Sequence, residues 1–201
     1  MILMITTLTA CGVLSNAKVS TIYVDRKGEV VSATIASLPT EQYDGDELKV
    51  SIDEAIATYN STKENEPISL NEFKVKKEQA TLRLTYATAG DYEAFNERTL
   101  FAGTIAEATA AGYDFEVDFI DSDKTTIKGS AILKEARDEL VIITNEPVQI
   151  QTTKDILYTS DNATIIDKRT AQVEDEAGST DNGITFGNAK VAYVIYGEPN
   201  Q

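Results

Sequence analysis

Short runs of alternating apolar and polar residues, separated by polar turns, recur along most of the chain. Residues 19–24 and 29–36 are both rich in Val, Ile, Thr and Tyr, and the polar turn at 25–28 ends in glycine, which predicts a β-hairpin. Residues 70–76 and 79–87 predict a second hairpin. Every second residue from 80 to 86 is apolar, so we expect one buried and one solvent-facing side there.

Helical spacing is confined to a few segments. Residues 47–60 predict a helix, because their apolar positions recur every three or four residues on one side. A carboxylate at Asp44 or Asp46 can cap its first turn. Two shorter helical segments are indicated by Thr88 and Thr104, each followed three residues later by an acidic residue as in a capping box.

The second half of the chain reads mainly as strands. Residues 113–119 alternate strictly between apolar and acidic residues, which predicts a strand with one buried and one acidic side. After a polar turn at 121–124, residues 125–133 predict its partner strand. Residues 190–196 are apolar on both sides, as in the central strand of a sheet. Residues 174–183 predict an acidic surface loop. Further short strands are expected at 139–144, 148–150, 156–159 and 163–167.

These elements amount to about ten short strands and two or three short helices. Hairpins dominate their order along the chain, so neighbouring strands run antiparallel. The sequence therefore predicts an α+β fold, with a mostly antiparallel sheet built from hairpins. The chain length of 201 residues favours one domain over two. We place that single α+β domain at residues 18–201.

The composition limits the chemistry open to this fold. With 33 acidic and 18 basic residues, the net charge is −15, and the chain has one cysteine, no histidine and no tryptophan. Catalysis that needs imidazole is excluded, as are zinc or copper sites built from Cys and His, and a disulfide within the chain. Nucleic-acid binding is disfavoured, because an acidic surface repels phosphate groups.

The one cysteine follows an unusual N-terminal stretch. Residues 1–8 are uncharged and mostly apolar, and they lead into Leu8, Thr9, Ala10 and Cys11. An aliphatic residue, two small residues and a cysteine resemble the lipobox of bacterial lipoproteins. The resemblance implies that residues 1–10 are the remnant of a signal peptide and that the sulfur of Cys11 carries a covalently bound diacylglycerol. The stretch has no Lys or Arg before it, so we expect the true start of the protein to lie upstream.

The anchor sets where the protein works. Residues 11–17 comprise the lipidated cysteine and a short tether, and the six residues after Cys11 reach roughly 20 Å when fully extended, so the body rides close to the bilayer. The layout is similar to that of uncharacterised envelope lipoproteins of Gram-positive bacteria. It implies a cell-membrane protein on the extracytoplasmic side, with the membrane and an envelope protein as partners. The competing interpretation is a buried first strand at 2–8 with Cys11 in the core.

An acidic cluster is the best candidate for a metal site. Carboxylates two apart on one strand lie roughly 6.6 Å from each other, and Ca²⁺ takes six to eight oxygen ligands. The spacing is not that of an EF-hand loop, and the competing interpretation is a solvated acidic strand face. The candidate calcium ligands are Asp114, Glu116, Asp118, Asp121 and Asp123.

The function that these features favour is non-catalytic binding or interaction at the cell envelope. No catalytic residue and no cofactor beyond the diacylglycerol are assigned. The alternatives are a carboxylate-dependent envelope hydrolase and a calcium-stabilised module. A small basic spot of Lys74, Lys76 and Arg83, expected on the outward side of the second hairpin, either meets anionic headgroups or balances neighbouring acids.

Overall fold

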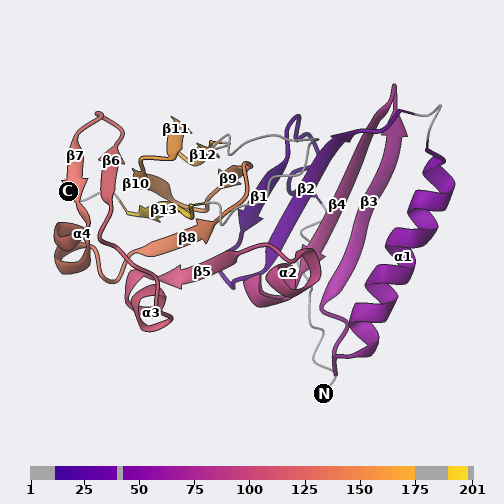
Figure 1. Ribbon diagram of the computed structural model, residues 1–201, viewed down its shortest axis with the longest axis horizontal. Helices are drawn as coiled ribbons and strands as arrows, with labels where there is room; N and C mark the ends of the chain where they lie inside the picture. The colour runs from indigo at the N-terminus through magenta and orange to yellow at the C-terminus, as the bar shows by residue number, and fades with distance from the viewer. Residues whose placement is uncertain (1–11, 40–42, 175–189, 199–201) are drawn as a thin grey trace, which may run out of the picture.

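The computed structural model describes residues 12–39, 43–174 and 190–198, and within them the chain forms thirteen strands and four helices (Figure 1). The strands are divided between two sheets. This confirms the predicted α+β class, with more strands and one more helix than expected. Leu8, Thr9, Ala10 and Cys11 lie outside the described residues, as does the expected loop at 174–183 beyond its first residue.

The seven-stranded sheet has the order β11-β12-β9-β1-β2-β4-β3. Its neighbours are antiparallel except for β1 and β9, which run parallel. Both hairpins predicted at the front of the chain are present as β1–β2 and β3–β4. The strands are β1 (Thr21–Val24), β2 (Val30–Ser37), β3 (Ile68–Lys76), β4 (Gln79–Tyr86), β9 (Gln149–Gln151), β11 (Ala163–Asp167) and β12 (Thr170–Val173).

The six-stranded sheet has the order β5-β8-β13-β10-β6-β7 and is antiparallel throughout. Every residue of β13 is buried, and the strand pairs with β8 on one side and β10 on the other. The expected central strand at 190–196 is thereby confirmed. The strands are β5 (Leu100–Thr104), β6 (Asp118–Asp121), β7 (Thr126–Lys128), β8 (Leu140–Thr144), β10 (Asp155–Ser160) and β13 (Ala192–Gly197).

Four helices pack against these sheets. The helix α1 (Gly45–Ser61) lies against β3 at the edge of the seven-stranded sheet, and α2 (Ala89–Asn96) lies between β4 and β5 (Figure 1). These two helices contribute Ile56 and Tyr92 to the core that also joins the two sheets. The Asp44 carboxylate accepts hydrogen bonds from the first backbone N–H groups of α1, which confirms the predicted cap. The short helices α3 (Ile105–Ala110) and α4 (Gly129–Glu135) pack on the six-stranded sheet. Among the described residues, no helix has the length and apolarity needed to cross a membrane.

Two hydrophobic cores lie on opposite faces of the six-stranded sheet. The larger core joins Ile142 and Val194 of this sheet to Ile22 and Ile150 of the seven-stranded sheet. The smaller core places the neighbouring residues of β8 and β13 against α3 and α4, and its sheet residues are Val141, Ile143, Tyr193 and Ile195. Alternate residues of β8 and β13 therefore serve different cores, which is why these strands are apolar on both faces.

The strand predicted at 113–119 is wrong over its first five residues, because β6 begins only at Asp118. The alternation of burial is nevertheless real, since Phe115 is buried while Asp114 and Glu116 are exposed. The backbone forms a loop because its polar groups find other partners. The Asp114 carbonyl accepts the Tyr193 hydroxyl at 2.6 Å, and the Asp114 carboxylate accepts the Glu116 backbone N–H at 2.8 Å.

The strand predicted at 125–133 is also only partly correct. It ends at Lys128, and the chain turns into α4 at Gly129. Gly129 donates its backbone N–H to the Val117 carbonyl at 3.0 Å, and a Cβ at this position would lie 1.5 Å from the Phe115 carbonyl oxygen. The close approach of two backbones at a glycine replaces the expected strand.

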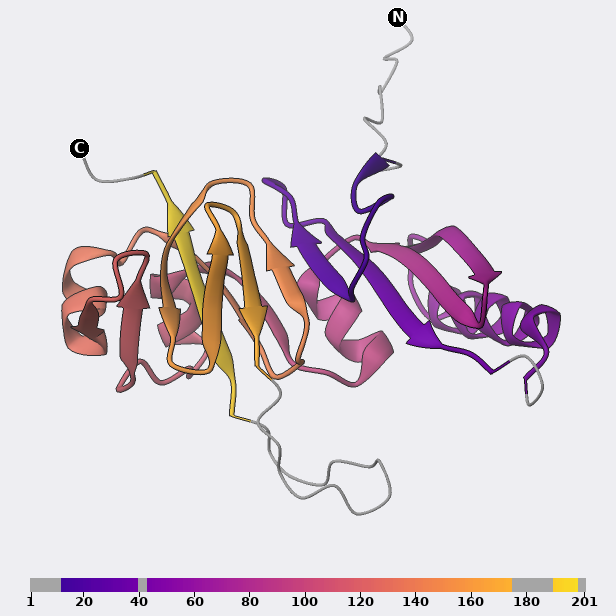
Figure 2. The same cartoon turned by 90° about the horizontal axis from the view of Figure 1, so that it is seen from above.

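The segment 12–17, expected to be an extended tether, forms turns on the face of the seven-stranded sheet that the helices do not cover (Figure 2). Ala17 donates its backbone N–H to the Leu14 carbonyl at 3.1 Å. Arg83 donates from Nη1 to the Val13 carbonyl at 3.0 Å and is only 6% exposed. Arg83 is therefore on the outward side as predicted, but it lies beneath the N-terminal turns instead of in solvent.

The contact at Gly129 predicts a large effect of a single methyl group. Gly129→Ala is expected to destabilise the protein by about 2 kcal/mol or more, because the new Cβ cannot fit against backbone atoms. Gly90→Ala in α2 is the matched control, since its nearest neighbour is the Thr88 hydroxyl at 3.7 Å. The control is expected to be neutral or slightly stabilising. Equal urea unfolding midpoints for the two variants would contradict this packing.

Candidate functional site

A groove of about 870 Å³ lies where the two sheets diverge, and we call it the β10–β11 groove. One wall is β11, the last strand of the seven-stranded sheet. The remaining surface comes from β10 and from β6 with the turn that follows it. Its apolar residues are Ile120, Ile156, Leu157, Ala163, Ile165 and Ile166. Its charged residues are Asp121, Lys124, Asp155, Asp161, Asp167 and Lys168.

The groove exists because the chain changes sheets between β10 and β11. At that turn Thr159 donates its hydroxyl to the Ala163 carbonyl at 2.9 Å, and Ser160 donates to Asn162 Oδ1 at 2.7 Å. Asn162 in turn donates to the Lys190 carbonyl at 3.2 Å. These bonds, of which the first two are buried, close one end of the groove and fix the angle at which β11 leaves β10.

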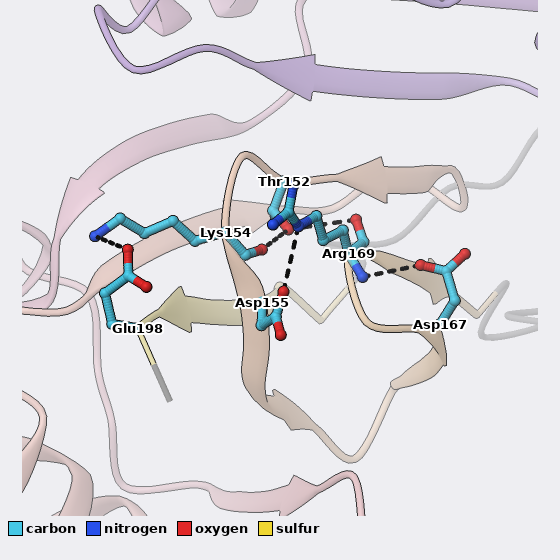
Figure 3. Close-up of polar contacts among 6 residues, drawn as sticks. All are labelled: Thr152, Lys154, Asp155, Asp167, Arg169 and Glu198. Carbon is cyan, nitrogen blue, oxygen red and sulfur yellow. Dashed lines mark hydrogen bonds and ion pairs between the residues drawn. The ribbon is translucent and has the colours of Figure 1, made fainter. Parts of the chain in front are cut away.

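The other end is closed by backbone and ionic contacts (Figure 3). Ile156 donates its backbone N–H to the Lys168 carbonyl at 2.7 Å. Arg169 Nε lies 3.2 Å from Asp155 Oδ1, and the Arg169 backbone N–H donates to Asp167 Oδ1 at 2.8 Å. The strands β10 and β11 are thus joined at both ends, and the groove opens between them.

The floor of the groove is apolar. Ile156 is 6% exposed, Ile120 and Ile165 are half-buried, and Ile166 is 53% exposed. The register between β10 and β13 shifts between residues 156 and 158, so Leu157 is an extra residue of β10. Such bulges re-aim side chains, and Leu157 lines the groove.

The rim of the groove is acidic, with four aspartates against two lysines. Two of the four carboxylates form ion pairs, Asp155 with Arg169 and Asp161 with Lys190. Asp121 and Asp167 instead accept backbone N–H groups of the turns that follow them. Within the described chain, neither has a Lys or Arg nitrogen within 4.0 Å, so their charge is available to a ligand.

The structure does not gather the predicted calcium ligands around one point. Asp114 and Glu116 belong to the loop before β6, so the expected column of carboxylates on one strand is wrong at these two positions. Asp118 lies on β6 and pairs with Lys128 at 2.7 Å. Asp121 accepts the backbone N–H groups of Asp123 and Thr125. In residues 12–39, 43–174 and 190–198, no three carboxylates are arranged to hold a metal ion.

Two carboxylates with a raised pKa, Glu146 and Glu29, were missed by the sequence reasoning. Burial raises the pKa of Glu146, although the Tyr92 hydroxyl, which donates to it at 2.7 Å, and the charge of Arg98 both act in the opposite direction. Burial and the nearby Asp25 charge raise the pKa of Glu29 as well. Neither residue lines the β10–β11 groove. Glu146 is buried because Tyr92 of α2 packs against the turn between β8 and β9. No local sequence pattern indicates a contact between residues so far apart in the chain.

The chain also contains one Ser-x-x-Lys spacing, near its N-terminus. Ser15 and Lys18 have the Ser-x-x-Lys spacing of some serine hydrolases. They flank the end of the N-terminal turns, and both are exposed. They do not line the β10–β11 groove. The spacing therefore does not place a nucleophile at the candidate site.

Glu146 makes the stability of the fold depend on pH. A carboxylate whose pKa is raised by folding stabilises the protein most below its unfolded pKa, and this contribution is lost as pH rises through the folded pKa. Glu146→Gln stays neutral and still accepts the Tyr92 hydroxyl, so we expect it to be more stable than wild type at pH 7 and to lose that advantage near pH 4. Urea unfolding at both pH values measures this, with exposed Glu54→Gln as the charge-matched control. A Glu146→Gln variant less stable than this control at pH 7 would contradict the assignment.

Comparison with known proteins identifies no relative of this chain. The sequence matches no protein-family model, no curated protein and no solved structure.

Proposed function

We propose that this chain is a lipid-anchored extracytoplasmic protein whose folded body binds another component of the cell envelope without catalysing a reaction. The observation that carries the binding role is the β10–β11 groove, with its apolar floor and charged rim. A concave apolar surface with a few polar groups at its edge is the usual form of a binding site.

Binding is favoured over hydrolysis by the state of the groove carboxylates. A general acid or base needs a carboxylate that is free to reach the reacting group of the substrate. In the groove, Asp155 and Asp161 are held in ion pairs, and Asp121 accepts two backbone N–H groups. Carboxylates held in such contacts are not placed to exchange protons with a substrate, while an acidic rim suits recognition of a cation.

The anchor is supported by the lipobox-like residues and by the chain that follows them. Leu8, Thr9 and Ala10 precede Cys11, and diacylglycerol on that sulfur supplies two acyl chains, enough for stable attachment to a bilayer. Gly12 begins the turns that Arg83 holds on the sheet. A thioether at Cys11 therefore leaves little free chain between the bilayer and the body, and the open sheet face beneath those turns (Figure 2) lies near the membrane.

Metabolic labelling tests the anchor. Bacterial cells that express the protein and are fed an azido fatty acid are expected to label the wild-type protein, which partitions into the membrane fraction. Cys11→Ser is expected to remove essentially all of the label, because the sulfur is the attachment point. Absence of label on the wild type, or label that survives Cys11→Ser, would contradict the anchor.

A further inference from the structure

We propose that the β10–β11 groove takes an extended, basic segment of a partner protein, which adds a strand to the free edge of β11. The inference rests on the binding role proposed above, because it names the ligand of that site. It does not depend on the lipid anchor, so either can fail while the other stands.

The edge of β11 is suited to pairing with another chain. Within the described residues β11 is the last strand of its sheet and pairs with β12 alone, through partners such as Thr164 with Gln172 and Ile165 with Ala171. An edge strand leaves the backbone N–H and C=O groups of its other side unpaired by the sheet. The groove follows the whole length of β11. An extended segment lying there can form the main-chain ladder used in strand addition.

The other sheet provides a floor for the added strand. In the six-stranded sheet β10 and β6 are neighbours, and both line the groove beside β11. Ile156 of β10 and Ile120 of β6 present apolar surface there. Since side chains of a strand alternate between two faces, a segment with an apolar residue at every second position places those residues on this floor. Its remaining side chains point away from the floor and toward the rim.

Charge selects which extended segment fits. The carboxylates of Asp121 and Asp167 stand at the rim without an ion-pair partner in the described chain. The whole chain carries −15, so its field attracts cations at a distance. The same charge disfavours a second copy of this chain as the occupant, because pairing β11 with β11 brings like charges together. The occupant is therefore a basic segment of a different protein.

The test uses the 201-residue chain carrying Cys11→Ser, which cannot be lipidated. The probe is a fluorescein-labelled peptide of alternating lysine and valine, seven residues long, and binding is followed by fluorescence anisotropy. We expect it to bind, and we expect the double variant Asp121→Asn with Asp167→Asn to bind it about tenfold more weakly. Asparagine still accepts the backbone N–H groups of both turns, so the variant keeps the fold. Glu54→Gln on α1, exposed and remote from the groove, is expected to leave binding unchanged.

Two further measurements separate strand addition from simple charge attraction. Methylating alternate backbone nitrogens of the peptide on its pairing edge removes ladder hydrogen bonds but keeps the charge, and we expect binding to be lost. Bound peptide is also expected to slow hydrogen exchange of amides within β11. Equal binding of the methylated peptide, equal binding of a glutamate–valine peptide, unchanged exchange in β11, or self-association of the chain through β11 would each overturn the proposal.

Discussion

The structure depends on the burial of two neighbouring strands from both sides. In β8 and β13, Ile142 and Val194 face the seven-stranded sheet, while Ile143 and Ile195 face α3 and α4. Each fully buried side chain of this size contributes roughly 1.5–3 kcal/mol of transfer free energy. A polar residue at any of these four positions would damage one core directly and weaken the sheet that both cores share. The two layers are therefore held together as one packed unit.

The candidate site is a consequence of the same arrangement. The chain passes from one sheet to the other at the turn after β10, and the hydrogen bonds of Ser160 and Asn162 fix that passage. The seven-stranded sheet then ends at β11, while β6 lies beyond β10 in the six-stranded sheet. The apolar side chains left at this boundary form a groove, and its acidic rim gives the groove a preferred ligand charge. The groove and the larger core therefore both result from the packing of the two sheets against each other.

The sequence predicted elements whose pattern is local. The front hairpins, the helix capped by Asp44 and the doubly buried strand at the end of the chain all follow from residue spacing. The strand prediction was wrong where side chains alternate between buried and exposed but the backbone pairs with no other strand. Phe115, for example, is buried although its backbone forms a loop. The burial of Arg83 could not be predicted, because residues far away in the sequence cover it. The groove could not be predicted either, because its residues come from β6, β10 and β11, which only the sheet topology brings together.

Amide hydrogen exchange of the free protein, read residue by residue, tests the central claim most directly. If β8 and β13 hold both cores while β11 is an open edge, the amides of Ile142 and Val194 exchange only on global unfolding. Amides of β11 that the sheet leaves unpaired then exchange orders of magnitude faster. Uniform protection along β11, or exchange in β13 as fast as in β11, would contradict the account.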